Sequence, residues 1–314
     1  MQIVLFTVNI VAPIFILILL GIFLKQIGMV NSEFVSKSSL LVFKVSLPSL
    51  IFLKIATVKI SEAFDAKLIL TSLLIVFLIA SFSWFLSTIL TKNPKDKGVF
   101  IQGSFRSNFA IIGLALVSNL LGESELGRAS LVLAFVMPLY NILAIIALTL
   151  PISKSAENTV LKSIGEIVKN PLIIAAVAAA PFSIYSIHLG SIATTTLTYL
   201  AKISLPLALI SIGASLNLTN LKEASKLSLA AMFNKLILFP TVAVVIGIFL
   251  HFDSNQLGIL FVLFASPTAI ASFVMADAMG RNSKLASDII VVTTLFSVIT
   301  LSIGIIILKY FALI

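Results

Sequence analysis

The chain has 314 residues, of which 60% are hydrophobic and 11% are charged, and it carries a net charge of +9. A soluble domain is about 45–50% apolar and about 25% charged, so this composition excludes a soluble fold. The lack of cysteine excludes disulfides and Cys-ligated metals, and two histidines leave little material for a His-based metal or catalytic site.

Ten apolar segments are long enough to cross a bilayer, which takes about 20 residues in a helix. In chain order they are 3–24, 38–56, 67–91, 98–121, 127–151, 163–183, 191–215, 226–250, 256–277 and 285–309. Lys44 and Lys54 interrupt the second segment, and the first lacks the basic start and the small-residue cleavage pattern of a signal peptide. We therefore predict an all-α polytopic membrane protein with ten transmembrane helices.

The basic residues in the loops predict the orientation of these helices, since cytoplasmic loops carry an excess of Lys and Arg. One set of alternate loops holds eleven of them: Lys25, Lys37, Lys92, Lys95, Lys97, Lys154, Lys162, Lys222, Lys226, Arg281 and Lys284. The other set, together with the two termini, holds five: Lys54, Lys59, Lys67, Arg128 and Lys309. We therefore expect a multi-pass protein of the cytoplasmic (inner) membrane with both termini outside. The positive charge then reflects this orientation and no nucleic-acid partner.

The two halves of the chain align without gaps at an offset of 158 residues. Lys44-Val45-Ser46-Leu47-Pro48 corresponds to Lys202-Ile203-Ser204-Leu205-Pro206 in this register. Because each half contains five spans, an odd number, the second half enters the membrane from the opposite side, as in many secondary transporters. We predict a first inverted repeat at 1–152, a short cytoplasmic loop at 153–162 and a second repeat at 163–314.

Proline inside a helix removes a hydrogen bond and frees the carbonyl group four residues earlier. Pro48 is expected to free the carbonyl of Lys44, and Pro206 that of Lys202. In lipid, a freed carbonyl needs a partner inside the protein or in a water-filled cavity. Both prolines are therefore candidate helix breaks, and a simple packing kink is the alternative.

The fourth span of each half carries a polar cluster inside an otherwise apolar helix. The first cluster, Ser107-Asn108, is followed by Gly113, and the second is Ser266-Pro267-Thr268. We predict that these spans are broken helices that cross at mid-membrane, with Gly113 and Pro267 as further helix breaks. The N-termini of half-helices would direct partial positive charge at an anion there. The alternative is that the hydroxyls bond back to their own helices.

Ionisable residues inside a membrane span are costly and mark candidate functional sites. Arg106, Lys44, Lys202 and Lys235 lie inside predicted spans, although Lys44 is close enough to the inner surface to snorkel. The nearest acidic residues lie at the cytoplasmic ends of spans: Glu166, Asp277 and Asp288. The imbalance predicts an anionic substrate.

Three short motifs resemble the auxin efflux carrier family, whose bacterial members include malate or malonate permeases and whose superfamily includes bile-acid/sodium symporters. They are Ser107-Asn108-Phe109-x-x-x-Gly113, Ser266-Pro267-Thr268-Ala269 and Met279-Gly280. The resemblance covers nearly the whole chain. It implies that the fourth and ninth spans cross at their breaks and hold the substrate carboxylate, which an elevator-like movement exposes to each side.

Within this resemblance, Asn108 occupies the position of the family's crossover Asn and Pro267 that of its crossover Pro. Phe109 replaces a Pro that is common at the first crossover, and Ser266 replaces an Asn that is common in the plant carriers. Both departures argue against the plant hormone itself as the substrate.

The main hypothesis from the sequence is a secondary transporter of small organic anions, not an enzyme, with no metal or organic cofactor. Its expected substrate-binding residues are Asn108, Ser107, Arg106, Ser266, Pro267, Thr268, Lys44 and Lys202. Ser266, Thr268 and Asn141 are the candidate ligands of a coupling cation. Sodium, a proton and the membrane potential alone all remain open as the driving force.

Three other functions stay open from the sequence. The first is a sodium-coupled symporter of bulkier, bile-acid-like anions. The second is an intramembrane enzyme, which would need a positioned acid, base, nucleophile or metal, and the third is a binding-only sensor. The alanine-rich run 175–180 permits close helix packing, either within one chain or in a homodimer.

Overall fold

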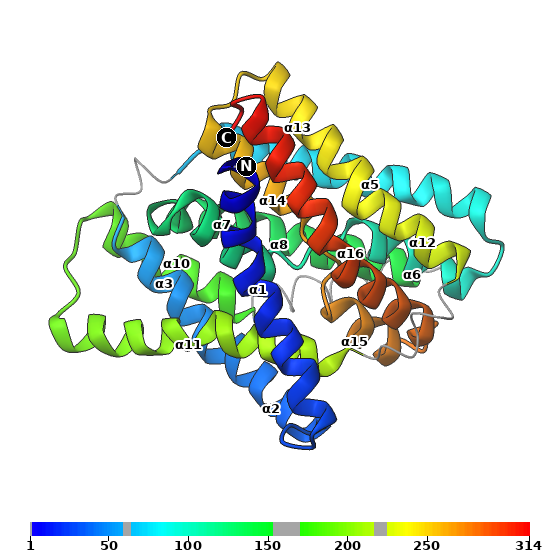
Figure 1. Ribbon diagram of the computed structural model, residues 1–314, viewed down its shortest axis with the longest axis horizontal. Helices are drawn as coiled ribbons and strands as arrows, with labels where there is room; N and C mark the ends of the chain where they lie inside the picture. The colour runs from blue at the N-terminus through cyan, green and yellow to red at the C-terminus, as the bar shows by residue number, and fades with distance from the viewer. Residues whose placement is uncertain (1, 59–63, 153–169, 217–224) are drawn as a thin grey trace.

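The computed structural model describes residues 2–58, 64–152, 170–216 and 225–314 (Figure 1). Among these residues the regular elements are helices, and the one β-contact is an isolated bridge. Seven of the described helices are long and apolar enough to cross a membrane. The chain is therefore an all-α polytopic membrane protein, as predicted, while the count of ten spans stays a prediction.

Each of the first five predicted spans has a helical counterpart. In chain order these are α1 (Gln2–Gln26); the continuous run of α2 (Ser32–Leu41), η1 (Val42–Ser46) and α3 (Leu47–Ala56); α5 (Ala66–Leu90); α6 (Pro94–Phe105) with η2 (Phe109–Gly113) and α7 (Leu114–Leu121); and α8 (Leu126–Thr149). The short helix η3 (Glu123–Glu125) joins α7 to α8.

The described residues of the second half also form helices at the predicted spans. Its helices are α10 (Pro171–Ile184); α11 (Ser191–Ser215); the continuous run of α12 (Lys226–Phe233), η5 (Asn234–Leu238) and α13 (Phe239–Phe249); α14 (Ser254–Ala265) with α15 (Ala271–Ala278); and α16 (Ser283–Tyr310). The predicted connecting loop 153–162 and the first residues of the sixth span, 163–169, lie outside the described residues. The inverted repeat therefore remains a prediction.

Short polar side chains begin half of the described α-helices. In each case the side chain accepts a hydrogen bond from a backbone N–H two or three residues later, which satisfies a donor that lacks an intrahelical acceptor. The capping residues are Asn31, Asp65, Asn93, Asn170, Ser225, Asp253 and Asn282. Hydrophobic patterning alone places these helix starts only to within a few residues.

Two spans contain a π-helical turn directly before a proline. The turn η1 precedes Pro48, and η5 precedes Pro240, and each proline occupies the second position of the following α-helix. The helix 32–56 therefore runs on through Pro48, and the break predicted there is wrong because the wider turn accommodates the missing donor.

The structure also contains helix where breaks were predicted at Pro206 and Gly113. Pro206 lies inside the uninterrupted helix α11, so the break predicted at Pro206 is also wrong. A proline removes one hydrogen bond, but its φ angle suits a helix, and the neighbouring bonds hold the chain straight enough to continue. Gly113 ends η2 and leads directly into α7, so that span breaks earlier, at residues 106–108.

The helices pack as two bundles. The small bundle consists of α1, α2, α3, α10 and α11, and it lies to the left and below in Figure 1. The large bundle consists of α5 to α8 and α12 to α16. The bundles meet where α1 contacts α7 and α16 and where α3 contacts α8.

Helices α1 and α11 cross at two glycines. A Cβ atom added to Gly213 would lie 1.9 Å from the carbonyl oxygen of Ile18, and one added to Gly21 would lie 2.1 Å from that of Ile210. Each helix thus presents a glycine to the backbone of the other, which is how small residues allow membrane helices to approach closely. This crossing fixes the core of the small bundle.

The two ends of the chain lie at the same end of the molecule (Figure 1). The ammonium of Lys309 in the last helix lies 4.8 Å from the ring centre of Phe6 in the first. An even number of membrane crossings would produce this arrangement.

Candidate functional site

The two broken spans interrupt their helices at positions that the polar clusters indicated. The fourth span leaves helical geometry at residues 106–108, between α6 and η2. The ninth does so at residues 266–270, between α14 and α15. In the second case Pro267 has no N–H to offer the carbonyl of Leu263, which ends the ladder of α14.

The two breaks lie side by side and pair through their backbones. Asn108 N–H donates to the carbonyl of Pro267 at 2.8 Å, and Ala269 N–H donates to that of Arg106 at 3.2 Å. Ser107 and Thr268 are thereby joined in an antiparallel bridge. The predicted crossing of the two breaks is thus present, and we call these residues, 106–108 and 266–269, the crossing.

Most polar side chains at the crossing bind backbone carbonyls. Ser266 Oγ donates to the carbonyl of Val262 at 2.7 Å, and Thr268 Oγ1 donates to that of Gly103, also at 2.7 Å. Ser107 Oγ lies 3.4 Å from the carbonyl of Ser266. Thr268 thus supplies a donor to a carbonyl that the first break leaves open, whereas the Ser266 hydroxyl bonds back to its own helix.

Asn108 differs from its neighbours. Its side chain is 6% exposed, and within the described parts of the chain no hydrogen bond involves its amide group. It immediately precedes η2, at the start of a half-helix whose first N–H groups have no intrahelical acceptor. A buried amide with both donors free, beside the positive end of a helix, is suited to bind a carboxylate.

Arg106 and Asn141 lie together at the crossing. The guanidinium Nη2 donates to Asn141 Oδ1 at 2.7 Å, and Nη1 contacts the sulfur of Met275. Arg106 is 7% exposed, so a positive charge lies within this part of the molecule. The oxygen of Asn141, predicted as a ligand of a coupling cation, is therefore already a hydrogen-bond acceptor.

Three further residues support the crossing, and of these Lys235 alone was among the intramembrane ionisable residues singled out from the sequence. Lys235 on η5 donates to the carbonyl of Phe264 at 2.9 Å, and Gln102 Nε2 donates to that of Ser272 at 2.8 Å. Thr293 Oγ1 accepts from Thr268 N–H at 3.2 Å. Gln102 is a polar residue deep in an apolar span, which is the signal that could have identified it.

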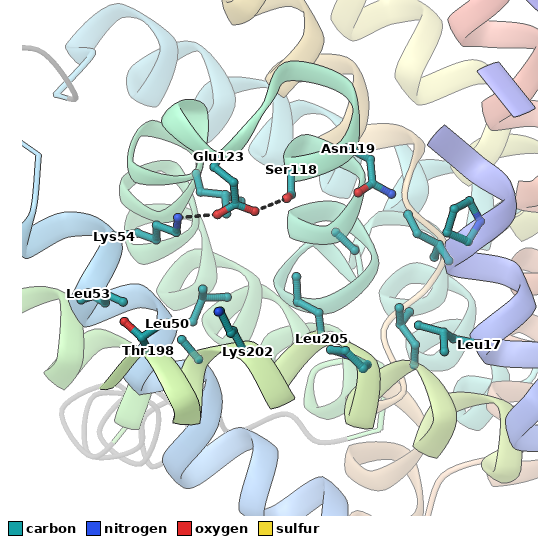
Figure 2. Close-up of a pocket in the computed structure, with 17 residues that line it drawn as sticks. Leu17, Leu50, Leu53, Lys54, Ser118, Asn119, Glu123, Thr198, Lys202 and Leu205 are labelled. Atoms are coloured by element: carbon teal, nitrogen blue, oxygen red, sulfur yellow. Dashed lines mark hydrogen bonds and ion pairs between the residues drawn. The ribbon is translucent and has the colours of Figure 1, made fainter. Parts of the chain in front are cut away.

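Lys202 and Lys44 lie away from the crossing. Lys202 lines a cavity of about 360 Å³ between the two bundles, beside Lys54, which forms an ion pair with Glu123 (Figure 2). Ser118 donates to the other oxygen of Glu123 at 2.5 Å. Lys44 lies on η1 with its side chain exposed. The structure therefore brings six of the eight predicted substrate-binding residues together and separates these two.

The cavity is mostly apolar. Its walls come from α1, α3, α7, η3, α8 and α11, and leucine is the residue type that lines it most often. In Figure 2, Lys202 points into the same space as the Lys54–Glu123 pair. No hydrogen bond or ion pair involves the Lys202 ammonium within the described residues, so it can receive an anionic group.

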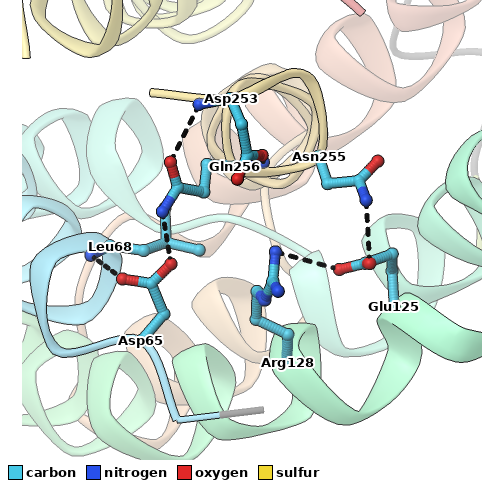
Figure 3. A network of polar contacts seen from close by, with 7 residues as sticks. All are labelled: Asp65, Leu68, Glu125, Arg128, Asp253, Asn255 and Gln256. Atoms are coloured by element: carbon cyan, nitrogen blue, oxygen red, sulfur yellow. Dashed lines mark hydrogen bonds and ion pairs between the residues drawn. The ribbon is translucent and has the colours of Figure 1, made fainter. Parts of the chain in front are cut away.

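A polar network joins three helices of the large bundle at one end (Figure 3). Gln256 donates to Asp65 at 2.5 Å, which connects α14 to the start of α5. Asn255 donates to Glu125 at 2.9 Å, and Glu125 lies 3.4 Å from Arg128 on α8. These contacts hold the ends of α5, α8 and α14 as one unit.

Acidic groups are few inside the described structure. Asp288, predicted at a membrane boundary, lies in the second turn of α16 and is 3% exposed, so it is buried. In the described residues no cluster of three His, Cys, Asp or Glu side chains could hold a metal ion.

Comparisons with known proteins agree with this architecture. A family model described as "Membrane transport protein" matches residues 6–305. The chain is 25% identical over 308 residues to an uncharacterized transporter of Methanocaldococcus jannaschii, covering 94% of this chain and 96% of the relative. It is 23% identical over 302 residues to the uncharacterized transporter YfdV of Escherichia coli, covering 92% and 93%. An uncharacterized transporter of Methanothermobacter thermautotrophicus is 24% identical over 294 residues, covering 93% and 95%.

Proposed function

Because the chain belongs to the membrane transport protein family, the family of the auxin efflux carriers, we propose that it carries small organic anions across the cytoplasmic membrane. Carboxylates such as malate or malonate are the proposed substrates. The movement would be elevator-like, with the large bundle shifting against the small bundle and exposing the crossing to each side in turn.

The observation that carries this proposal is the free amide of Asn108. It is buried at the crossing, at the start of a half-helix, while the surrounding hydroxyls are engaged. A carboxylate accepting hydrogen bonds from this amide and from the first N–H groups of η2 would also meet the partial positive charge of the helix end.

Charge supports an anion rather than a cation as cargo. Arg106 places a guanidinium at the crossing, and Lys202 places an ammonium in the cavity between the bundles. An anion entering through this cavity would pass from one positive group toward the other. Lys44, exposed on η1, has no part in this path.

The cavity favours a second candidate substrate class. Its volume of about 360 Å³ lies within the range of about 300–1,000 Å³ that is usual for ligand pockets. Its lining is mostly apolar, with one ammonium that has no partner among the described residues. A bulkier amphipathic carboxylate would fill such a space better than malate does.

Uptake into proteoliposomes tests both classes. Labelled malate, malonate and an aromatic or bile-acid-like carboxylate would be offered to the wild type and to Asn108→Ala, with Asn9→Ala, an exposed asparagine on α1, as the matched control. We expect saturable uptake that Asn108→Ala lowers at least ten-fold and Asn9→Ala leaves unchanged. Uptake that persists in Asn108→Ala would reject the site, and no uptake of any of these anions would reject the substrate class.

The orientation can be tested independently, because the chain has no cysteine. We propose that both termini lie outside. A single cysteine at Leu313 should then react with a membrane-impermeant maleimide on intact cells, whereas one at Lys95 should react only after the membrane is permeabilised. The reverse pattern would invert the topology.

A further inference from the structure

The broken end of α14 has lost the donors that would continue its helix. Pro267 has no N–H, Thr268 N–H donates to Thr293 Oγ1 at 3.2 Å, and Ala269 N–H donates to the carbonyl of Arg106 at 3.2 Å. The carbonyls of residues 263–265 are therefore without their usual intrahelical partners. In a membrane, each such group needs a donor or a cation.

Lys235, which lies on another helix, supplies a donor to one of these carbonyls. Its side chain is fully buried, and its Nζ lies 2.9 Å from the carbonyl oxygen of Phe264. The residue sits on the π-helical turn η5, in the middle of the span 226–249. The C-terminal end of a helix carries partial negative charge, which attracts a positively charged group.

The broken end of α6 has a different kind of hydrogen-bond donor. The carbonyl of Gly103 receives the neutral hydroxyl of Thr268, and Ser107 Oγ reaches across to the second break. Within the described residues, a buried ammonium therefore binds an open carbonyl at the second break, whereas the open carbonyl of the first break receives a hydroxyl.

Freed carbonyls at half-helix ends are where secondary transporters coordinate coupling cations. A tethered ammonium and a mobile metal cation would compete for the same oxygen. We propose that Lys235 is a built-in cation that occupies the broken end of α14, so that the carrier needs no sodium ion there. It acts as a positioning residue, holding the end of α14 that leads into Ser266–Thr268. Where it is tested by uptake, this inference rests on the proposed transport function.

The first test compares uptake in sodium, potassium and choline chloride for the wild type, Lys235→Ala, Lys235→Met and Lys202→Ala. We expect wild-type uptake to agree within two-fold in the three salts. Lys235→Ala, which vacates the space, should lose at least ten-fold in choline and recover part of this loss in sodium or methylammonium chloride. Lys235→Met, which fills the space with an apolar chain, should lose activity without recovery.

The second test needs no substrate, so it can be read even where none of the offered anions is carried. Thermal unfolding in detergent is followed in the same salts. The melting temperature of Lys235→Ala should rise with sodium or methylammonium concentration, as binding to the folded state requires, while that of the wild type and Lys202→Ala should not. If Lys235→Ala fails to fold, the sodium dependence of the wild-type protein alone tests the inference.

Two results would overturn the inference. One is wild-type uptake that requires sodium, or wild-type melting that sodium specifically raises. The other is a folded Lys235→Ala protein whose uptake and melting are the same in every salt.

Discussion

The molecule contains two close helix crossings that are built in opposite ways. Helices α1 and α11 cross with complete backbones, and Gly21 and Gly213 let each helix touch the carbonyl groups of the other. Helices α6 and α14 meet where both backbones are interrupted, and reciprocal hydrogen bonds between 106–108 and 267–269 join them.

The difference separates stability from binding. At the α1–α11 crossing each glycine lies against the backbone of the other helix, so this crossing serves to hold the two helices together. The α6–α14 crossing exposes peptide groups, and the chain satisfies most of them while leaving Asn108 free. Substitutions at the two crossings should therefore affect the free energy of unfolding and transport in different proportions.

The largest loss of stability is expected from Gly213→Val. The added side chain would meet the backbone at Ile18, which cannot move aside as a side chain can. Overpacking of this kind lowers the free energy of unfolding by about 3 kcal/mol or more. Chemical denaturation in detergent would measure it, with Gly190→Ala, where a Cβ would meet nothing within 4 Å, as the control. A Gly213→Val protein as stable as the wild type would show that α1 and α11 do not cross here.

Thr268→Val should have the next largest effect. It keeps the shape of the side chain but leaves the buried carbonyl of Gly103 without its hydroxyl donor. An unsatisfied buried group costs about 1–3 kcal/mol, whereas Thr268→Ser keeps the donor and should cost less. Equal unfolding free energies for the Val and Ser variants would show that the Thr268 hydroxyl does not stabilise this crossing.

Glu123→Gln tests the joint between the bundles. It breaks the ion pair with Lys54, which connects α3 to the turn before α8. A partly exposed pair contributes under about 1 kcal/mol, and salt screens it. The destabilisation should be small and should shrink further at high salt. A salt-independent loss would mean that the hydrogen bond to Ser118 dominates.

Asn108→Ala should change stability least, by about 0.5 kcal/mol or less, because no described hydrogen bond of the side chain is lost. Asn141→Ala provides the contrast, since it removes an acceptor from Arg106 and should lower the melting temperature. Normal melting together with lost uptake in Asn108→Ala would assign a ligand to this residue. Equal destabilisation by both variants would show that Asn108 is structural.

The amino-acid sequence predicts the membrane segments well, because hydrophobic length is a local property. The predicted span 191–215 coincides with α11, and 67–91 differs from α5 by one residue at each end. The two breaks could also be predicted, since Ser107-Asn108 and Ser266-Pro267-Thr268 place polar groups where lipid would not tolerate them. Their crossing was predicted because each cluster lies in the fourth span of its half.

The sequence does not predict features that depend on the direction of a side chain around its helix or on a contact with a distant residue. Pro48 and Pro206 occupy equivalent sequence positions, but the former follows a π turn and the latter lies in a regular helix. The depth of Lys202 suggested the crossing, whereas its direction on α11 places it in the cavity. The partner of Lys235 is a carbonyl 29 residues further along, which no local pattern indicates.

The π turn η5 has a consequence for how the span 226–249 can vary in length. A π turn holds one residue more than the corresponding α-helical turn. Deleting one residue from Asn234–Leu238 would restore a regular helix and leave Lys226–Phe233 and Phe239–Phe249 in nearly the same relative orientation, while the side chains of the former turn would point in other directions. The membrane-spanning length would hardly change, but Lys235 would no longer face Phe264. The direction of the Lys235 side chain is thus set by the number of residues in the turn. A shortened chain would still insert into the bilayer but would lose the hydrogen bond from Lys235 to the end of α14.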